Sequence, residues 1–157
     1  MTPKILIVVG YFEPSFHGGI SKSIQNLLSE TSHKFEFEII TRDRDNKKEK
    51  PYDKIFSNKW NKNKKTNIFY ADETKLTLRK ISSVLLEKNY NIIHLNSMFD
   101  IFSIKFLILN RLKKIKNCKI ILSPRGEFGD ASFRIRKFKK IIYLFIMKKF
   151  GFFDNVI

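Results

Sequence analysis

Cysteine is nearly absent from this chain of 157 residues, which holds only Cys118. A single thiol excludes an intramolecular disulfide framework and a cysteine-rich metal site. Cys118 lies in an apolar stretch, so we interpret it as a core residue and not as a nucleophile. None of the three histidines is accompanied by carboxylates at ligand spacing, and the sequence therefore predicts no metal site and no cofactor.

Long hydrophobic runs are also absent. The first apolar run, Ile5–Val9, is too short for a signal peptide and indicates a strand. The longest candidate, Ile141–Met147, is flanked by lysines and falls well below the ~20 residues that a membrane-spanning helix needs. We therefore expect a cytoplasmic protein, and peripheral attachment to the inner face of the plasma membrane stays open.

Acidic residues are scarce: 15 Asp and Glu stand against 31 Lys and Arg, for a net charge of +16. Between Arg111 and Lys149 the only acidic residues are Glu127 and Asp130. Such a field attracts anions, among them nucleic acid, acidic lipid headgroups and phosphorylated substrates. An AT-rich coding sequence, which favours Lys, Ile, Asn and Phe, explains part of the excess without any function.

Apolar runs and helical spacing alternate along the chain, which is long enough for one domain over residues 1–157. The pattern predicts strands over residues 4–9, 35–41, 67–70, 91–95 and 119–122, helices over 20–32, 74–88, 99–112 and 132–150, and the start of a further strand at 154–157. Because the strands are apolar throughout, we expect an α/β fold with a doubly wound, mainly parallel sheet. Residues 42–66 are rich in charge and lack apolar periodicity, which predicts a long, mobile basic loop.

Gly18 and Gly19 open the first predicted helix. A helix N-terminus presents unpaired backbone N–H groups and a partial positive charge, and two glycines let a phosphate approach closely. The spacing matches neither the dinucleotide fingerprint nor a P-loop, so a simple tight turn remains the alternative.

Polar side chains follow two predicted strands, where an α/β sheet binds its ligands. His94 and Asn96 project to the same side, and Asn96 and Ser97 could bond to a sugar or phosphate, whereas a lone strand histidine is more often a satisfied core residue. Arg125 can grip a phosphate or carboxylate with two N–H groups, and Gly126 lets a ligand come close. The alternative for the loop around Arg125 is a surface turn with scattered charges.

The predicted helix after this loop combines apolar and basic residues. Its basic residues are Arg134, Arg136, Lys137, Lys139 and Lys140. Such a helix can lie on an anionic membrane, and we assign these five residues to a membrane-facing surface. A core-packed helix with a solvated basic face is the alternative.

In chain order, these pieces resemble the retaining glycosyltransferases of the GT-B class, and in particular the family 4-like enzymes of bacterial polysaccharide and lipopolysaccharide synthesis. The motifs that carry the resemblance are the opening strand and loop with Pro14, Gly18-Gly19-Ile20, Asn91 to Ser97, and Ser123 to Glu127 before a helix with Lys139-Lys140. The resemblance covers essentially the whole chain. It implies one Rossmann-like, acceptor-side half of a GT-B fold, with the C-terminal donor-binding domain absent.

The resemblance also implies partners and roles. The donor is a nucleotide sugar and the acceptor a glycan or a lipid-linked sugar, and one half alone is not expected to turn over. Gly18 and Gly19 then face the donor diphosphate. The implied catalytic residues are Asn96, Arg125 and Glu127, and the implied cleft residues are His94, Ser97 and Gly126. Many relatives carry a second histidine where this chain has Asn96, so the role of Asn96 stays open.

Two other interpretations remain. One is a non-catalytic basic module that binds nucleic acid or an anionic membrane. The aromatic residues mostly fall in apolar runs, and no helix-turn-helix or zinc signature is present, so no specific nucleic-acid binding is expected. The other is a truncated or degenerate gene product, because the chain stops within an apparent strand.

Overall fold

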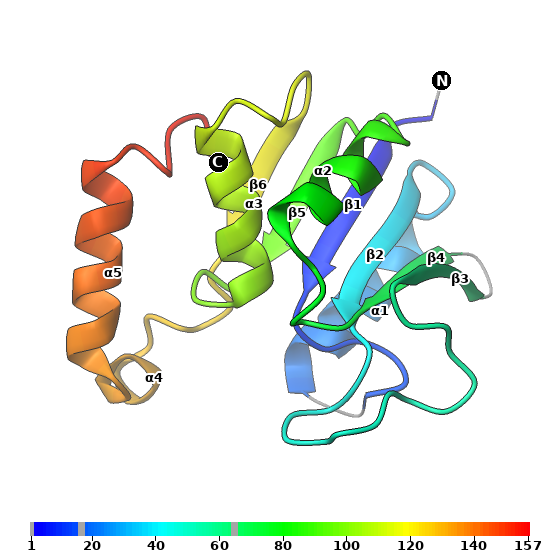
Figure 1. Ribbon diagram of the computed structural model, residues 1–157, viewed down its shortest axis with the longest axis horizontal. Coiled ribbons are helices and arrows are strands. Elements are labelled where there is room, and N and C mark those ends of the chain that lie inside the picture. The colour runs from blue at the N-terminus through cyan, green and yellow to red at the C-terminus, as the bar shows by residue number, and fades with distance from the viewer. Residues whose placement is uncertain (1, 16–17, 64–65) are drawn as a thin grey trace.

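The computed structural model describes residues 2–15, 18–63 and 66–157 and has an α/β fold, with a mainly parallel sheet flanked by helices (Figure 1). The strands are β1 (Lys4–Val9), β2 (Glu36–Arg42), β3 (Lys59–Asn63), β4 (Thr66–Ala71), β5 (Ile92–Asn96) and β6 (Lys119–Ser123). The helices are α1 (Gly18–Thr31), α2 (Leu78–Leu86), α3 (Ile101–Arg111), α4 (Asp130–Arg134) and α5 (Lys137–Lys149). The prediction of an α/β fold with a mainly parallel sheet is confirmed.

The six strands pair in the order β3-β4-β2-β1-β5-β6. All neighbours run parallel except β3, which pairs antiparallel with β4 at one edge. After β1 the chain adds β2 and then β4 on one side, and later β5 and β6 on the other. This order is compatible with a Rossmann-like fold, and it makes β1 and β5 the pair at which the direction of strand addition reverses.

Two hydrophobic clusters lie on opposite faces of the sheet because successive side chains of a strand point to opposite faces. Leu6 and Val8 of β1 belong to the cluster that packs under α2 and α3. Ile7 and Val9 belong to the cluster that includes Ile24 of α1, and Figure 1 shows α1 behind the sheet. The apolar runs of the sequence are thus strands buried on both faces.

Three segments differ from the sequence-based expectations. Strand β3 lies inside 42–66, for which the sequence predicts a loop, and its polar side chains carry no strand pattern because it is an edge strand. The single helix predicted over 132–150 is two helices, because Arg136 adopts a left-handed conformation with φ of 57° between α4 and α5. The strand predicted at 154–157 is reduced to one parallel bridge between Val156 and Ile120.

Over the described residues, every helix is too short or too polar to traverse a bilayer. Cys118 is partly buried against the larger cluster, and burial raises the pKa of its thiol to about 11. A thiol with so high a pKa holds little thiolate near neutral pH, in line with the interpretation of Cys118 as a packing residue.

Candidate functional site

The candidate residues meet at the carboxyl ends of β1, β5 and β6. Ser97 begins the loop from β5 to α3, Arg125 lies in the loop after β6, and α1 follows β1 at the same edge (Figure 1). In open α/β sheets this edge is where ligands bind, most often where the strand order reverses. The chain therefore brings its predicted polar residues to one place.

Arg125 is the centre of this cluster. Its Nε donates to Oδ1 of Asn96 at 2.8 Å, and its Nη1 donates to Oγ of Ser23 on α1 at 3.2 Å. The guanidinium thus bridges β5 and α1 across the edge of the sheet. The sequence analysis did not single out Ser23, although its place one turn after Gly18-Gly19 aligns it with the same edge.

The charge of Arg125 has no carboxylate partner within 4 Å among the described residues, and Nη2 makes no hydrogen bond there. Its neighbours Asn96 and Ser23 are neutral. Most partly buried arginines are paired, because an uncompensated cation is costly away from water. A guanidinium held in place by neutral groups is well prepared for an anionic ligand.

Asn96 holds Arg125 in place, because its side-chain oxygen accepts the hydrogen bond from Nε of Arg125. It is only 1% exposed, and its Nδ2 donates to the carbonyls of Val8 at 3.3 Å and of His94 at 3.2 Å. With both ends of the carboxamide engaged, Asn96 fixes the direction of the arginine and leaves no face toward solvent. Asn96 thus holds the guanidinium of Arg125 in place, and the catalytic role that the resemblance implies for it stays a prediction.

Glu127 ties two loops together. Its carboxylate accepts hydrogen bonds from the hydroxyl of Ser97 and from the backbone N–H of Met98, the latter at 2.6 Å. Ser97, Arg125 and Gly126 all have positive φ values, of 91°, 54° and 78°. Such conformations are costly for residues other than glycine and persist where surrounding contacts impose them. Glu127 supplies those contacts and holds the loop that carries Arg125.

His94 lies beside the cluster on the same face of the sheet. Its Nε2 is 2.8 Å from Oγ of Ser123 at the end of β6. Burial, and in second place the nearby cation of Arg125, lower the pKa of His94 below 6.5. The imidazole is therefore neutral at pH 7 and can serve as a hydrogen-bond partner rather than as a second cation.

Gly18 and Gly19, the first residues of α1, are exposed. Among the described residues, a Cβ placed at Gly18, Gly19 or Gly126 would meet no heavy atom within 4 Å. Gly18 has a φ of 80°, a conformation that few side chains tolerate, so glycine is required there for the turn into the helix. Residues 16–17, in the opening loop with Pro14 that precedes α1, lie outside the described residues.

Near the carboxyl end of β1, the space beside Gly10 is occupied by the side chain of Arg42. Arg42, at the end of β2, donates from Nη1 to Oδ2 of Asp100 at 2.7 Å and from Nε to Glu73 at 2.5 Å. A Cβ at Gly10, just after β1, would lie 2.6 Å from Nη1 of Arg42. A side chain at position 10 would therefore collide with this ion pair, which fills the space beside the first turn after β1.

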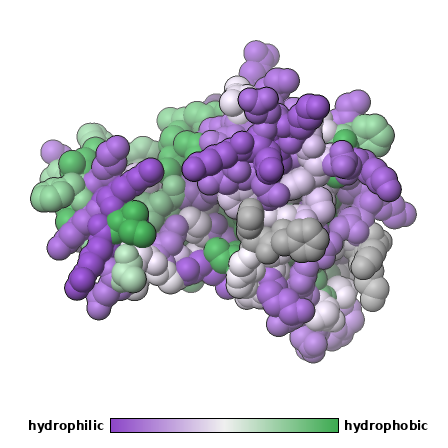
Figure 2. All heavy atoms as spheres, turned by 90° about the horizontal axis from the view of Figure 1, so that it is seen from below, coloured by the Kyte–Doolittle hydropathy of each residue, from purple (hydrophilic) through white to green (hydrophobic). Residues whose placement is uncertain are grey.

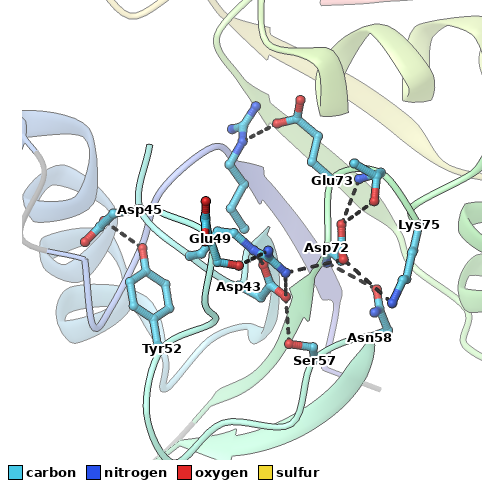
Figure 3. A network of polar contacts seen from close by, with 12 residues as sticks. Asp43, Asp45, Glu49, Tyr52, Ser57, Asn58, Asp72, Glu73 and Lys75 are labelled. Carbon is cyan, nitrogen blue, oxygen red and sulfur yellow. Dashed lines mark hydrogen bonds and ion pairs between the residues drawn. The ribbon is translucent and has the colours of Figure 1, made fainter. Parts of the chain in front are cut away.

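The segment after β2 is held by further polar contacts (Figure 3). Asp43 is 1% exposed and accepts from Nε of Arg44 at 2.7 Å and from the Ser57 hydroxyl at 2.6 Å. Tyr52 donates to Asp45 at 2.8 Å, and Arg44 also reaches Asp72 at 3.3 Å. Unlike Arg125, the arginines of this segment are therefore matched with carboxylates.

A cavity of about 1140 Å³ lies at the opposite, amino-terminal edge of the sheet, between the ends of α2 and α3. Its lining includes none of the candidate residues. Across residues 2–15, 18–63 and 66–157, no three His, Cys, Asp or Glu side chains gather as metal ligands.

No family model, curated protein or solved structure matches this chain. Its function is therefore argued from the geometry of the site.

Proposed function

We propose that this chain is the acceptor-side half of a retaining, GT-B-type glycosyltransferase, with a doubly wound, Rossmann-like architecture. It would help to move a sugar from a nucleotide-sugar donor to a glycan or lipid-linked acceptor at the cytoplasmic face of a membrane. The observation that carries the proposal is Arg125, a bridging guanidinium with neutral partners at the carboxyl edge of the sheet.

The chemistry of glycosyl transfer suits such a site. The anomeric carbon loses a nucleoside diphosphate while an acceptor hydroxyl forms the new bond on the same face, and negative charge accumulates on the departing phosphates. Fixed N–H donors and cations lower the barrier when they are already aimed at that charge. In this chain the free Nη2 of Arg125 and the open N-terminus of α1 are the donors available for that purpose.

The residues take different parts in this proposal. Arg125 contacts the anionic ligand, and Gly18 and Gly19 allow a phosphate to approach the helix. Asn96 and Ser23 position the guanidinium, and Glu127 holds the loops. The opposite wall of the site would come from a second domain that binds the donor.

Titration with inorganic pyrophosphate and with a nucleoside-diphosphate sugar, followed by backbone amide chemical shifts, tests the proposal. We expect the largest changes at Gly18, Gly19, Ser23 and Arg125. Arg125→Ala should weaken binding roughly tenfold or more, because it removes hydrogen bonds to a charged ligand. The matched control is Arg79→Ala, which removes an exposed arginine from α2 on the other face.

Two results would contradict the proposal. In one, shifts spread over the exposed lysines and do not change in Arg125→Ala. In the other, pyrophosphate binds with equal affinity to Arg79→Ala and Arg125→Ala while both proteins keep the far-ultraviolet spectrum of the parent.

A further inference from the structure

Helix α5 presents an apolar surface to solvent. Eight of the twelve large apolar side chains that are most exposed in the described residues belong to 128–150. On α5 itself they are Phe138 (82% exposed), Phe145 (65%), Ile142 (57%), Ile141 (44%) and Ile146 (43%). Figure 2 shows the hydrophobic surface gathered at the end of the molecule where α5 lies, crossed by long hydrophilic side chains.

These five residues share one side of the helix. At about 100° per residue they span an arc of about 140°. The opposite side is the one that packs on the protein: Met147 is buried, and Tyr143 donates from its hydroxyl to the carbonyl of Met98 at 3.0 Å. The exposed apolar arc is therefore a second face and not the loose edge of a packed one.

Lysines border the arc. On the helical wheel Lys137 and Lys148 lie along one margin, Lys139 lies along the other, and all three are exposed. Lys149 lies within the arc, at the C-terminal end of the helix, and its Nζ is 5.9 Å from the ring centroid of Phe145. Lys140 differs, because its Nζ donates to the carbonyl of Ser132 at 2.7 Å and lies over Phe99. The predicted membrane-facing set thus loses Lys140, which is directed inward.

We propose that the exposed arc of α5 docks on the surface of an anionic lipid bilayer, with its aromatic and aliphatic side chains in the interfacial layer and its lysines at the headgroups. Between Asp130 and Asp154 the chain has no acidic residue, so the charge around the arc is of one sign. An apolar face bordered by lysines is the pattern of helices that lie in a membrane interface. This inference does not depend on the proposed function.

Other occupants fit less well. In a symmetric pair of chains, two such arcs would bring lysines of the same sign against each other. Nucleic acid would use the exposed rings of Phe138 and Phe145, but Ile141, Ile142 and Ile146 lie between them and offer bases nothing to stack on or bond to.

Co-sedimentation with lipid vesicles tests the inference. We expect binding to vesicles of phosphatidylcholine mixed with phosphatidylglycerol, weak binding to phosphatidylcholine alone, and a decrease as salt is added. A Phe145→Trp protein should show a blue shift of its emission on anionic vesicles relative to the parent, whereas Leu86→Trp, at an exposed position on α2, should not.

Paired substitutions separate the apolar and basic contributions. Phe138→Ser with Phe145→Ser should reduce vesicle affinity roughly tenfold or more, and Leu86→Ser should leave it unchanged. Lys137→Gln with Lys139→Gln should reduce affinity by a similar factor. The matched control is Lys48→Gln with Lys50→Gln, which removes the same charge from an exposed loop.

Three outcomes would overturn the inference. One is equal binding to neutral and anionic vesicles. Another is unchanged affinity in the Phe138→Ser, Phe145→Ser protein. A third is that these two substitutions abolish a concentration-dependent dimer, or binding to polyuridylic acid, while vesicle binding persists. Failure of pyrophosphate binding at Arg125 leaves the inference intact, so the two proposals can fail separately.

Discussion

Helix α3 and helix α5 are both rich in Ile, Leu and Phe, yet the rest of the protein covers them very differently. In α3 the buried residues are Phe102, Ser103, Phe106, Leu107 and Leu109, whereas Met147 is the buried residue of α5. The difference is one of position: α3 lies on the sheet, and α5 lies beyond its β6 edge (Figure 1). Apolar content alone therefore does not tell which helix forms the core.

The N-terminus of α3 is also better stabilised than that of α5. Asp100 caps α3, with Oδ1 accepting from the N–H of Phe102 at 2.9 Å. Before α5, Arg136 has a left-handed backbone and makes no capping bond with its side chain. Helix α3 is thus stabilised both by its N-cap and by its packing on the sheet. Helix α5 is held by a few contacts on its inner side, such as that of Tyr143 with Phe99.

The largest expected effect concerns one phenylalanine in each helix. Phe106→Ala in α3 should lower the free energy of unfolding by about 4 kcal/mol, because Phe106 is fully buried and a cavity would remain. Phe138→Ala in α5 should change it by less than about 0.5 kcal/mol, because the ring is exposed. Urea denaturation measures both. Similar losses in the two proteins would mean that α5 is covered in solution.

The same contrast explains how far the sequence could lead. The sequence predicts a strand over residues 4–9, and these residues form β1, because a short, continuous run of apolar and β-branched residues is typical of a strand buried on both faces. The gathering of His94, Asn96 and Arg125 at one edge followed from the parallel order of the strands. The burial of Asn96 and the bridge to Ser23 did not, because they depend on how β1, β5 and α1 come together in three dimensions.

The features that the sequence did not predict also have physical causes. No Gly or Pro marks the break at Arg136, so helical periodicity continued through it. Strand β3 is set by its pairing with β4, and Trp60, packed on Phe69, is its one large apolar residue, too little for a strand pattern. The outward face of α5 has the composition of a core face, and only its place in the fold distinguishes the two.

A second expected effect tests the start of each helix. Asp100→Ala should cost about 3 kcal/mol, because it removes the cap of α3 and one carboxylate from the largely buried Arg42. Asp100→Asn should cost less, because Oδ1 can still accept from Phe102. Arg136→Ala before α5 should stay within about 0.5 kcal/mol. If the Asn and Ala variants were equally destabilised, the ion pair and not the cap would be the main contribution of Asp100.

The smallest expected effect is a dependence of protein stability on pH. It arises from His94 in the sheet and not from α5. Helix α5 contains only lysines and Tyr143 as ionisable groups, with no histidine and no carboxylate. In the sheet, burial and then the cation of Arg125 hold the pKa of His94 below 6.5. An unfolded histidine takes up a proton near that pH and the folded one does not, so the protein loses stability as the pH falls from about 6.5 through the folded-state pKa.

His94→Gln isolates this contribution, because the carboxamide can keep a hydrogen bond to Ser123 but cannot be protonated. Urea denaturation of both proteins between pH 7 and pH 5 should show the parent losing more stability than the variant over this range. The carboxylate of Glu38 does not interfere: burial favours its neutral form, but hydrogen bonds from Lys88, Tyr90 and Asn67 outweigh that effect and keep its pKa below 4.5. Parallel curves for the parent and the variant would show that the pKa of His94 is the same in the folded and the unfolded protein, and would remove the electrostatic contrast between the two regions.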